Sequence, residues 1–424
     1  MAFDQWFNPI TWTVFVALTA VNLLVLLYAT GRYPALRPWV LRQLRRLSRR
    51  TDLEWLDWIP LLVAAGIAYA AVSAYGIASG AYGCFPPGVS DPVGVLNSGH
   101  ALLAGGNPFY VPDCGGHLEI PYGLAAVLID ALGSLGGLPG VYLVWGVLAL
   151  ALLPLAWLVA GSDRRLIVVY LGTSALYVPL ISSQIDGVTN ALVPVAILLS
   201  IYLARRHELA AAVLGGFLST ARFPTLFPIL GATGANRRHR LLAFLAAAAT
   251  FGAVSGLSYL AWKSDFLGPV FLNQVGRRSF SLNFYGVLLF ANALPSSIAI
   301  EGVQAGLTLA LVLVVFLRVR SPVLSASLVL VGLSLLTPFL SFNILIWLLP
   351  VALVGARARW WLWGIASVGS VNYDLALNVW AWDDGVTWPS AVLDLVLTAL
   401  LIGLLLELWR DERRARAAPH ATGG

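Results

Sequence analysis

The sequence predicts an all-α polytopic membrane protein with roughly 11 transmembrane helices, together with re-entrant or short helices and a long external loop. Apolar residues make up 59% of the 424-residue chain and charged residues 11%, whereas soluble domains have about 45–50% and about 25%. The apolar residues form uninterrupted runs of about 20, the length that crosses a hydrocarbon core of ~30 Å. The run Leu241–Trp262 contains no charge and no regular alternation, so helices are expected rather than barrel strands.

The basic residues predict which loops face the cytoplasm. The formal net charge is +6, and nearly all basic residues are arginines in short clusters between apolar runs. This is the positive-inside pattern of membrane proteins, so a groove for nucleic acid is not expected. The cluster Arg32–Arg50 places the N-terminus outside, and the cluster Arg410–Arg416 places the C-terminus inside. Because Met1–Ile10 has no basic residue, a cleavable signal peptide is not expected.

The arginine clusters also set the order of the predicted elements. Residues 1–57 form an extra N-terminal span and a basic linker, residues 58–410 form the main module, and residues 411–424 are expected to be a disordered cytoplasmic tail. The predicted spans are Thr11–Thr30, Trp58–Ala78, Val141–Ala160, Leu166–Ser183, Ile185–Ala204, Leu241–Trp262, Ile298–Leu317, Pro322–Leu340, Asn343–Gly355, Trp360–Trp380 and Trp388–Trp409.

Two further apolar segments are predicted to enter the membrane or lie on it without crossing. Pro121–Gly136 is short and ends in glycines, so an external or re-entrant helix is expected. Glu208–Ala235 has arginines before and after it that both belong inside, which predicts two short helices bent at residues 221–224, Ala-Arg-Phe-Pro. Because irregular backbone at membrane depth is tolerated where it lines a protein cavity, the bend predicts a site.

The longest polar stretch, Gly80 to about Ile120, is predicted to be external and contains both cysteines of the chain. A disulfide between Cys84 and Cys114 is expected on this oxidising side. It would close a loop of about 30 residues and contribute roughly 3–4 kcal/mol in the chain-entropy model. The alternative is two buried free thiols. A metal site from His100, His117, Asp113 and Cys114 is not expected, because their spacing matches no closed zinc pattern.

Three arginines are candidates for binding a phosphate. Arg222 lies in an apolar segment, where an arginine costs about 2.5–3.5 kcal/mol on insertion scales, so a functional partner such as a lipid phosphate is expected. The alternative is that its side chain reaches the external interface. Arg277 and Arg278 lie in the second external loop, about Lys263–Ser296, where basic pairs are scarce. Their alternative role is pairing with Asp265 or Asp113.

Three short motifs resemble those of the GT-C membrane glycosyltransferases, and more narrowly the polyprenyl-phosphate-mannose-dependent branch, similar to glycosyltransferase family 87. Ser90–Phe109 resembles the first external loop of that branch, in which an acidic residue precedes a helix ending in Ala-Gly-Gly-x-Pro-aromatic. Ser183–Gly187 is similar to its Gly-Gln-Asn segment, and Leu214–Pro224 to its Gly-Leu-Gly…Lys-x-x-Pro stretch. The resemblance covers about Trp58–Gly355 loosely and implies a GT-C-like bundle with an external catalytic loop.

The sequence departs from that pattern in three places. Arg222 stands where a lysine is common, which keeps the charge but adds a fork of donors. Ile120-Pro121-Tyr122 replaces the usual Tyr-Pro-Pro, and Asn343 lies in a stretch that often carries a histidine.

The resemblance implies a division of roles among the candidate residues. Asp91 would be the catalytic base, with Asp113 and Glu119 in reserve, and Arg222, Arg277 and Arg278 would bind the donor phosphate. No metal and no cofactor is expected. The residues expected to contact the acceptor or the sugar are His100, Asn107, Glu119, Gln184, Asp186, Asn283 and Asn343. For Gln184, Asp186 and Asn343 the alternative is helix capping or packing, which we favour for Asp186.

The implied reaction moves a sugar, expected to be mannose, from a polyprenyl-phosphate-sugar donor to a lipid, glycan or protein acceptor with inversion. It would take place on the extracytoplasmic face of the plasma membrane. Two other classes of protein remain open. A transporter or flippase of a phosphate-bearing lipid would use the same arginines but would not need an acidic residue in the outer loop. A non-catalytic membrane scaffold would leave the external arginines without a purpose.

Overall fold

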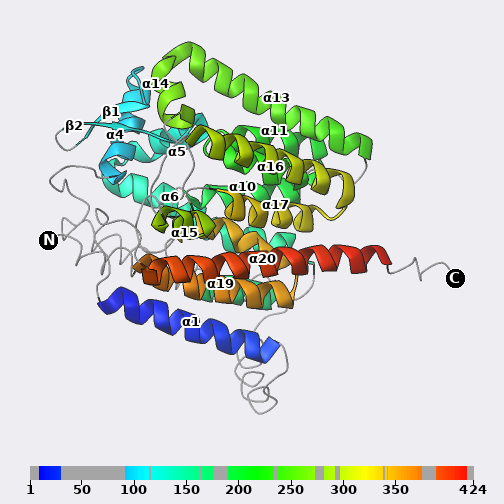
Figure 1. Ribbon diagram of the computed structural model, residues 1–424. Coiled ribbons are helices and arrows are strands. Elements are labelled where there is room, and N and C mark those ends of the chain that lie inside the picture. The colour runs from blue at the N-terminus through cyan, green and yellow to red at the C-terminus, as the bar shows by residue number, and fades with distance from the viewer. Residues whose placement is uncertain are drawn as a thin grey trace, which may run out of the picture.

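The computed structural model describes residues 9–29, 91–113, 116–161, 164–174, 190–232, 237–272, 281–291, 297–337, 340, 342–374 and 388–417. These residues are mostly helical, as predicted (Figure 1). The first half contains α1 (Pro9–Ala29), α4 (Asp91–Leu103), β1 (Tyr110–Asp113), β2 (Gly116–Glu119), α5 (Leu124–Ser134), α6 (Gly137–Val159), α7 (Arg164–Thr173) and α10 (Leu192–Ala204).

The second half continues the bundle with short and long helices in alternation. Its elements are α11 (Glu208–Ser219), η4 (Phe223–Thr225), α12 (Leu226–Ala232), α13 (Arg237–Trp262), α14 (Ser264–Leu267), η5 (Gly268–Leu272), α15 (Phe284–Phe290), α16 (Ser297–Arg318), α17 (Pro322–Leu336), α18 (Phe342–Leu345), η6 (Ile346–Leu353), α19 (Ala356–Asp374) and α20 (Trp388–Ala417).

Three helices in the described part of the chain are long and apolar enough to cross a membrane. They lie at Gly137–Val159, His239–Trp262 and Ser390–Arg414, with 23 to 25 residues each. At 1.5 Å per residue, such lengths exceed the ~30 Å hydrocarbon core. Other apolar helices, such as Leu192–Ala204 and Pro322–Leu336, have 10–17 described residues. The three long helices support a membrane protein, and the count of roughly 11 spans stays a prediction.

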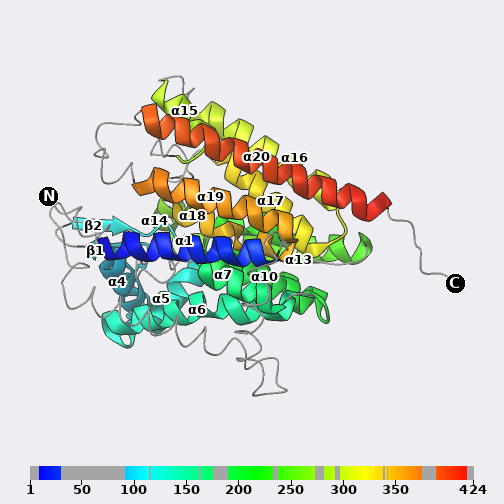
Figure 2. The ribbon, with the colours of Figure 1, turned by 90° about the horizontal axis from the view of Figure 1, so that it is seen from below.

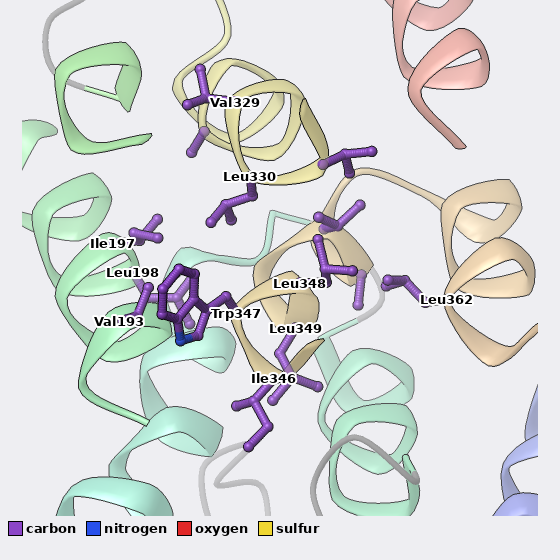
Figure 3. Packing of buried hydrophobic residues seen from close by; sticks show 14 of the residues in the cluster. Val193, Ile197, Leu198, Val329, Leu330, Ile346, Trp347, Leu348, Leu349 and Leu362 are labelled. Carbon is purple, nitrogen blue, oxygen red and sulfur yellow. The ribbon is translucent and has the colours of Figure 1, made fainter. Parts of the chain in front are cut away.

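The helices lie side by side around one large apolar core, and two smaller apolar clusters lie at the end that carries α4, the hairpin and α5. α1 packs on α7 and α19 along one side, and α13 packs on α11 along another (Figures 1 and 2). The helix η6 packs against α10, α17 and α19. Its Trp347 lies beside Val193 and Leu198 of α10, and Leu348 lies on the other side, toward Leu362 of α19 (Figure 3). The strands and α4 gather at one end of the bundle, opposite the C-terminal end of α20 (Figure 1).

The predicted span Asn343–Gly355 is wrong in its geometry. The segment is one short turn of α-helix, α18, followed by the 3₁₀-helix η6, which contains Pro350. Proline has no N–H to donate and its ring blocks regular α-helical geometry on its N-terminal side. The tighter helix is tolerated because η6 is buried among other helices rather than exposed to lipid, and Trp347 donates a 3.1 Å hydrogen bond to Asn190.

Two other expectations need correction. Asp411–Ala417 continue α20 as regular helix, so this part of the expected disordered tail is ordered; Arg416 and Glu412 pair within it at 2.8 Å. The all-α prediction also missed a small antiparallel hairpin, in which Tyr110 lies opposite Glu119 and Pro112 opposite His117.

The arginines near helix ends have a structural role that a charge pattern alone does not reveal. Arg205 donates to the carbonyl oxygens of Leu158 and Val159 at the end of α6. Arg240 donates to the Val319 carbonyl just after α16, and Arg359 donates to the last turn of η6. Because the last carbonyls of a helix have no partner within it, these guanidinium groups satisfy them at one end of the bundle.

Candidate functional site

The described residues contain about half of the predicted site. His100, Asn107, Glu119, Arg222 and Asn283 have described side chains, Asp91 is the first residue of α4, and Asn343 lies in α18. The remaining calls lie outside the described residues, namely Cys84, Cys114, Gln184, Asp186, Arg277 and Arg278.

The Ala-Gly-Gly-Asn-Pro-Phe motif ends α4 and redirects the chain. Gly105 has φ +73°, a left-handed conformation that glycine adopts at low cost after a helix. Gly106 N–H donates to the Ala101 carbonyl at 2.8 Å, which closes the helix end. Asn107 Oδ1 then accepts from Phe109 N–H at 3.0 Å, a local side-chain turn that turns the next residues inward.

The motif attaches the first of the two predicted external loops to the start of the second. Asn107 Nδ2 donates to Asp265 Oδ2 at 2.8 Å, so this hydrogen bond connects the two loops. Phe109 is fully buried against the rings of Trp262 and Phe266, with centroids 5.3 and 5.1 Å away. Trp262 also donates from its indole N–H to the Gly106 carbonyl at 3.3 Å.

A chain of aromatic rings continues from these loops to the bend beside Arg222. Phe266 contacts Phe271 at 5.7 Å, and Phe271 contacts Phe223 at 5.8 Å, both edge-to-face. Phe223 also packs on Phe227 and Phe251 at 5.2 and 5.5 Å. Such pairs are each worth about 0.5–1.5 kcal/mol beyond the apolar area they bury. The aromatic chain therefore couples both external loops to the residue that follows Arg222.

The bend predicted at residues 221–224 is confirmed. α11 ends at Ser219, Arg222 is extended with φ −142° and ψ 106°, and η4 begins at Phe223 with Pro224 next. Proline cannot donate the hydrogen bond that would continue α11, but it fits the first turn of a new helix, so Pro224 breaks the helix locally.

The bend is docked on the exit of the first external loop. Gly123 N–H donates to the Ala221 carbonyl at 3.2 Å, and Ala125 N–H at the start of α5 donates to Thr220 Oγ1 at 3.2 Å. The half-buried guanidinium of Arg222 lies over the Tyr122 ring, with its Cζ 4.2 Å from the centroid. This cation–π contact is worth about 0.5–2 kcal/mol and holds the charge beside the loop.

The hairpin carries Glu119, which lies a few residues before the contact between Tyr122 and Arg222 in the sequence. Asn97 of α4 donates to the Pro112 carbonyl at 2.7 Å, and Ile120 N–H donates to the Phe109 carbonyl at 3.0 Å. These bonds tie the hairpin to the helix that begins with Asp91. Glu119 is exposed and lies opposite Tyr110 in the register, three residues before Tyr122.

Two predicted sugar contacts are engaged in the fold itself. Asn283 is fully buried, and its amide donates to the carbonyls of Ser334 and Thr337 at 2.9 and 2.7 Å. Its Oδ1 accepts hydrogen bonds from the Ser281 hydroxyl and from Tyr285 N–H, so both ends of the Asn283 amide bond to the protein itself. His100 Nε2 lies 3.1 Å from the Ser134 carbonyl and connects α4 to the end of α5.

The residues that the sequence reasoning missed are aromatic. Tyr122 carries the Arg222 contact, and Trp262, Phe266 and Phe271 carry the loop-to-loop packing. These aromatic residues cluster in the sequence at the predicted external ends of apolar runs, and this clustering could have indicated that they pack together. Within the described ranges, no group of three or more His, Cys, Asp or Glu residues could hold a metal ion. No model of a known protein family matches the chain, and no curated protein sequence matches it.

Proposed function

We propose that this protein is a membrane glycosyltransferase that transfers a sugar, expected to be mannose, from a polyprenyl-phosphate-sugar to a lipid, glycan or protein acceptor. The observation that supports the proposal is the docking of the first external loop on the bend that carries Arg222. It brings the end of the stretch Leu214–Pro224 against Tyr122 and Gly123, which follow the stretch Ser90–Phe109 and its hairpin in the chain. Both stretches resemble the GT-C pattern.

In the proposed reaction, the Asp91 carboxylate takes the proton from an acceptor hydroxyl. The hydroxyl oxygen forms a bond to the anomeric carbon as the bond from that carbon to the phosphate oxygen breaks, and the configuration inverts. The leaving polyprenyl phosphate keeps the electron pair of the broken bond. Arg222, together with Arg277 and Arg278, neutralises the charge that develops on it, an electrostatic role that is strongest where water is excluded.

The direct test is reconstitution in proteoliposomes with a radiolabelled polyprenyl-phosphate-mannose. Transfer of the label to an acceptor supports the proposal, whereas movement of intact donor between leaflets without transfer identifies a flippase. If neither transfer nor movement of the donor is observed, a non-catalytic membrane scaffold is the remaining class.

Variants at Arg222 test its role in the same assay. Arg222→Ala should lower turnover by about 10²–10³-fold, the effect of losing one positioned donor, and Arg222→Lys should keep part of it because the charge remains. Arg206→Ala is the control, since Arg206 is exposed at the far end of the bundle. Equal activity of Arg222→Ala and wild type would overturn the assignment.

A further inference from the structure

At the end of the bundle opposite the proposed active site, three arginines surround one carboxylate. Glu407 of α20 lies 2.8 Å from Arg357 of α19, and 3.6 Å from both Arg410 and Arg414 of its own helix. The Glu407 side chain is only 9% exposed, whereas those of Arg357, Arg410 and Arg414 are 64%, 65% and 58% exposed. The carboxylate is therefore the buried centre and the cations form the outer rim.

The positive charge of this group exceeds its negative charge. Arg414 also meets Asp411 at 3.2 Å, so two carboxylates face three guanidinium groups, and exposed Arg413 lies on the next position of the helix. Each guanidinium has five N–H donors, and a single carboxylate contact occupies only part of them. A further anion would reduce the repulsion between the three guanidinium groups gathered around this carboxylate. The outer rim thus has both surplus charge and surplus donors.

The surroundings indicate that this anion belongs to a lipid. The arginines lie at the end of the candidate span Ser390–Arg414, and the same helix exposes Ile402 and Leu406 by 45% and 53% one or two turns earlier. In α19, the Trp361 ring packs so closely on α20 that a Cβ at Gly403 would lie 2.4 Å from it. Exposed apolar surface for acyl chains and a basic rim therefore follow one another along this closely packed helix pair.

We propose that Arg357, Arg410 and Arg414 bind the phosphate of an anionic phospholipid at the junction of α19 and α20. Basic pockets between transmembrane helices recognise such head groups. Bidentate hydrogen bonds from guanidinium groups suit phosphate oxygens. The site holds the ends of the two helices together through a membrane component, and it does not depend on the proposed transferase activity.

The test uses the full-length protein purified in detergent, with phosphatidylglycerol, phosphatidylcholine or inorganic phosphate added. Native mass spectrometry should show one phosphatidylglycerol retained per chain, and the unfolding temperature should rise with phosphatidylglycerol but not with phosphatidylcholine, because only a ligand of the folded state stabilises it. The double variant Arg357→Gln/Arg410→Gln should bind phosphatidylglycerol at least 10-fold more weakly. The control variant Arg206→Gln/Arg318→Gln, with exposed arginines near the same end, should bind like wild type.

A second variant separates lipid binding from a purely structural ion pair. Glu407→Gln removes the competing carboxylate, so it should bind phosphatidylglycerol more tightly even if it unfolds at a lower temperature. Unchanged or weaker binding by Glu407→Gln would overturn the proposal. So would equal retention of phosphatidylcholine and phosphatidylglycerol, or equal stabilisation by inorganic phosphate, which would indicate a site for small anions rather than lipid.

Discussion

Gly123 is the position where one added methyl group should separate the first external loop from the bend that carries Arg222. A Cβ at Gly123 would lie 1.8 Å from the Thr220 carbonyl oxygen and 2.8 Å from its carbon, both backbone atoms that cannot rotate away. The φ and ψ of Gly123, −84° and −174°, are open to alanine, so the effect of Gly123→Ala is steric rather than conformational.

The junction must therefore move apart by more than 1 Å before normal contact distance is reached. Overpacking of this kind costs about 1–3 kcal/mol, and the hydrogen bonds from Gly123 and Ala125 to the bend add about 0.5–1.5 kcal/mol each if they are lost. With both hydrogen bonds lost, we expect Gly123→Ala to lower the free energy of unfolding by about 2–6 kcal/mol. Because the movement also separates Tyr122 from Arg222, donor binding should weaken.

The measurement is unfolding of the reconstituted protein by heat or denaturing detergent, beside a donor-binding assay. Gly252→Ala is the matched control, since a Cβ there meets nothing within 4 Å and alanine is favoured over glycine inside α13 by about 1 kcal/mol. If Gly123→Ala were as stable as Gly252→Ala, the close docking of the bend on the loop would be refuted.

Four other predictions follow from the same residues. Asp91→Asn should keep donor binding but lower transfer by about 10²–10⁴-fold, whereas Glu119→Gln should have a much smaller effect. A larger loss of transfer in Glu119→Gln than in Asp91→Asn would assign the catalytic base to Glu119. Mass spectrometry without reductant should find Cys84 and Cys114 joined, and reduction should cost roughly 3–4 kcal/mol of stability; two alkylated thiols in unreduced protein would refute the bond. Phe109→Ala should cost about 3–5 kcal/mol, as for other buried aromatics, and should loosen the loops in hydrogen exchange; unchanged protection would contradict their docking. Cysteines introduced near the two termini should be labelled from opposite sides of the membrane, and labelling from one side would reverse the assumed topology.

The sequence predicted best where the cause is local. An uncharged apolar run of sufficient length predicts α13 and its end at Trp262, although the helix begins at Arg237, before that run. The break at Arg222 follows from the proline two residues later and from arginines at both ends. The helix α4 between Asp91 and the glycine pair was implied by the resemblance, and its end has a local cause, since Gly105 adopts a left-handed conformation. These are effects of neighbouring residues, which a single chain displays directly.

The prediction was poorest where a segment's geometry depends on its neighbours. The segment 343–355 has the composition of a span, yet Pro350 and the surrounding core make it a buried 3₁₀-helix. Asn283 has the chemistry of a sugar contact, but carbonyls 51 and 54 residues away bind its amide. The arginines Arg205 and Arg240 mark a side of the membrane in the sequence, whereas in the fold they also satisfy the ends of distant helices.

Composition and spacing alone therefore predict a helical membrane protein with a broken helix at Arg222, because lipid demands long apolar runs and proline interrupts them locally. The tertiary structure alone decides that Tyr122 lies beneath Arg222, and that Phe109 packs on Trp262 and Phe266. Such contacts depend on close packing between segments about a hundred residues or more apart. A side chain's type limits its partners, but only the packed backbone determines which of them it meets.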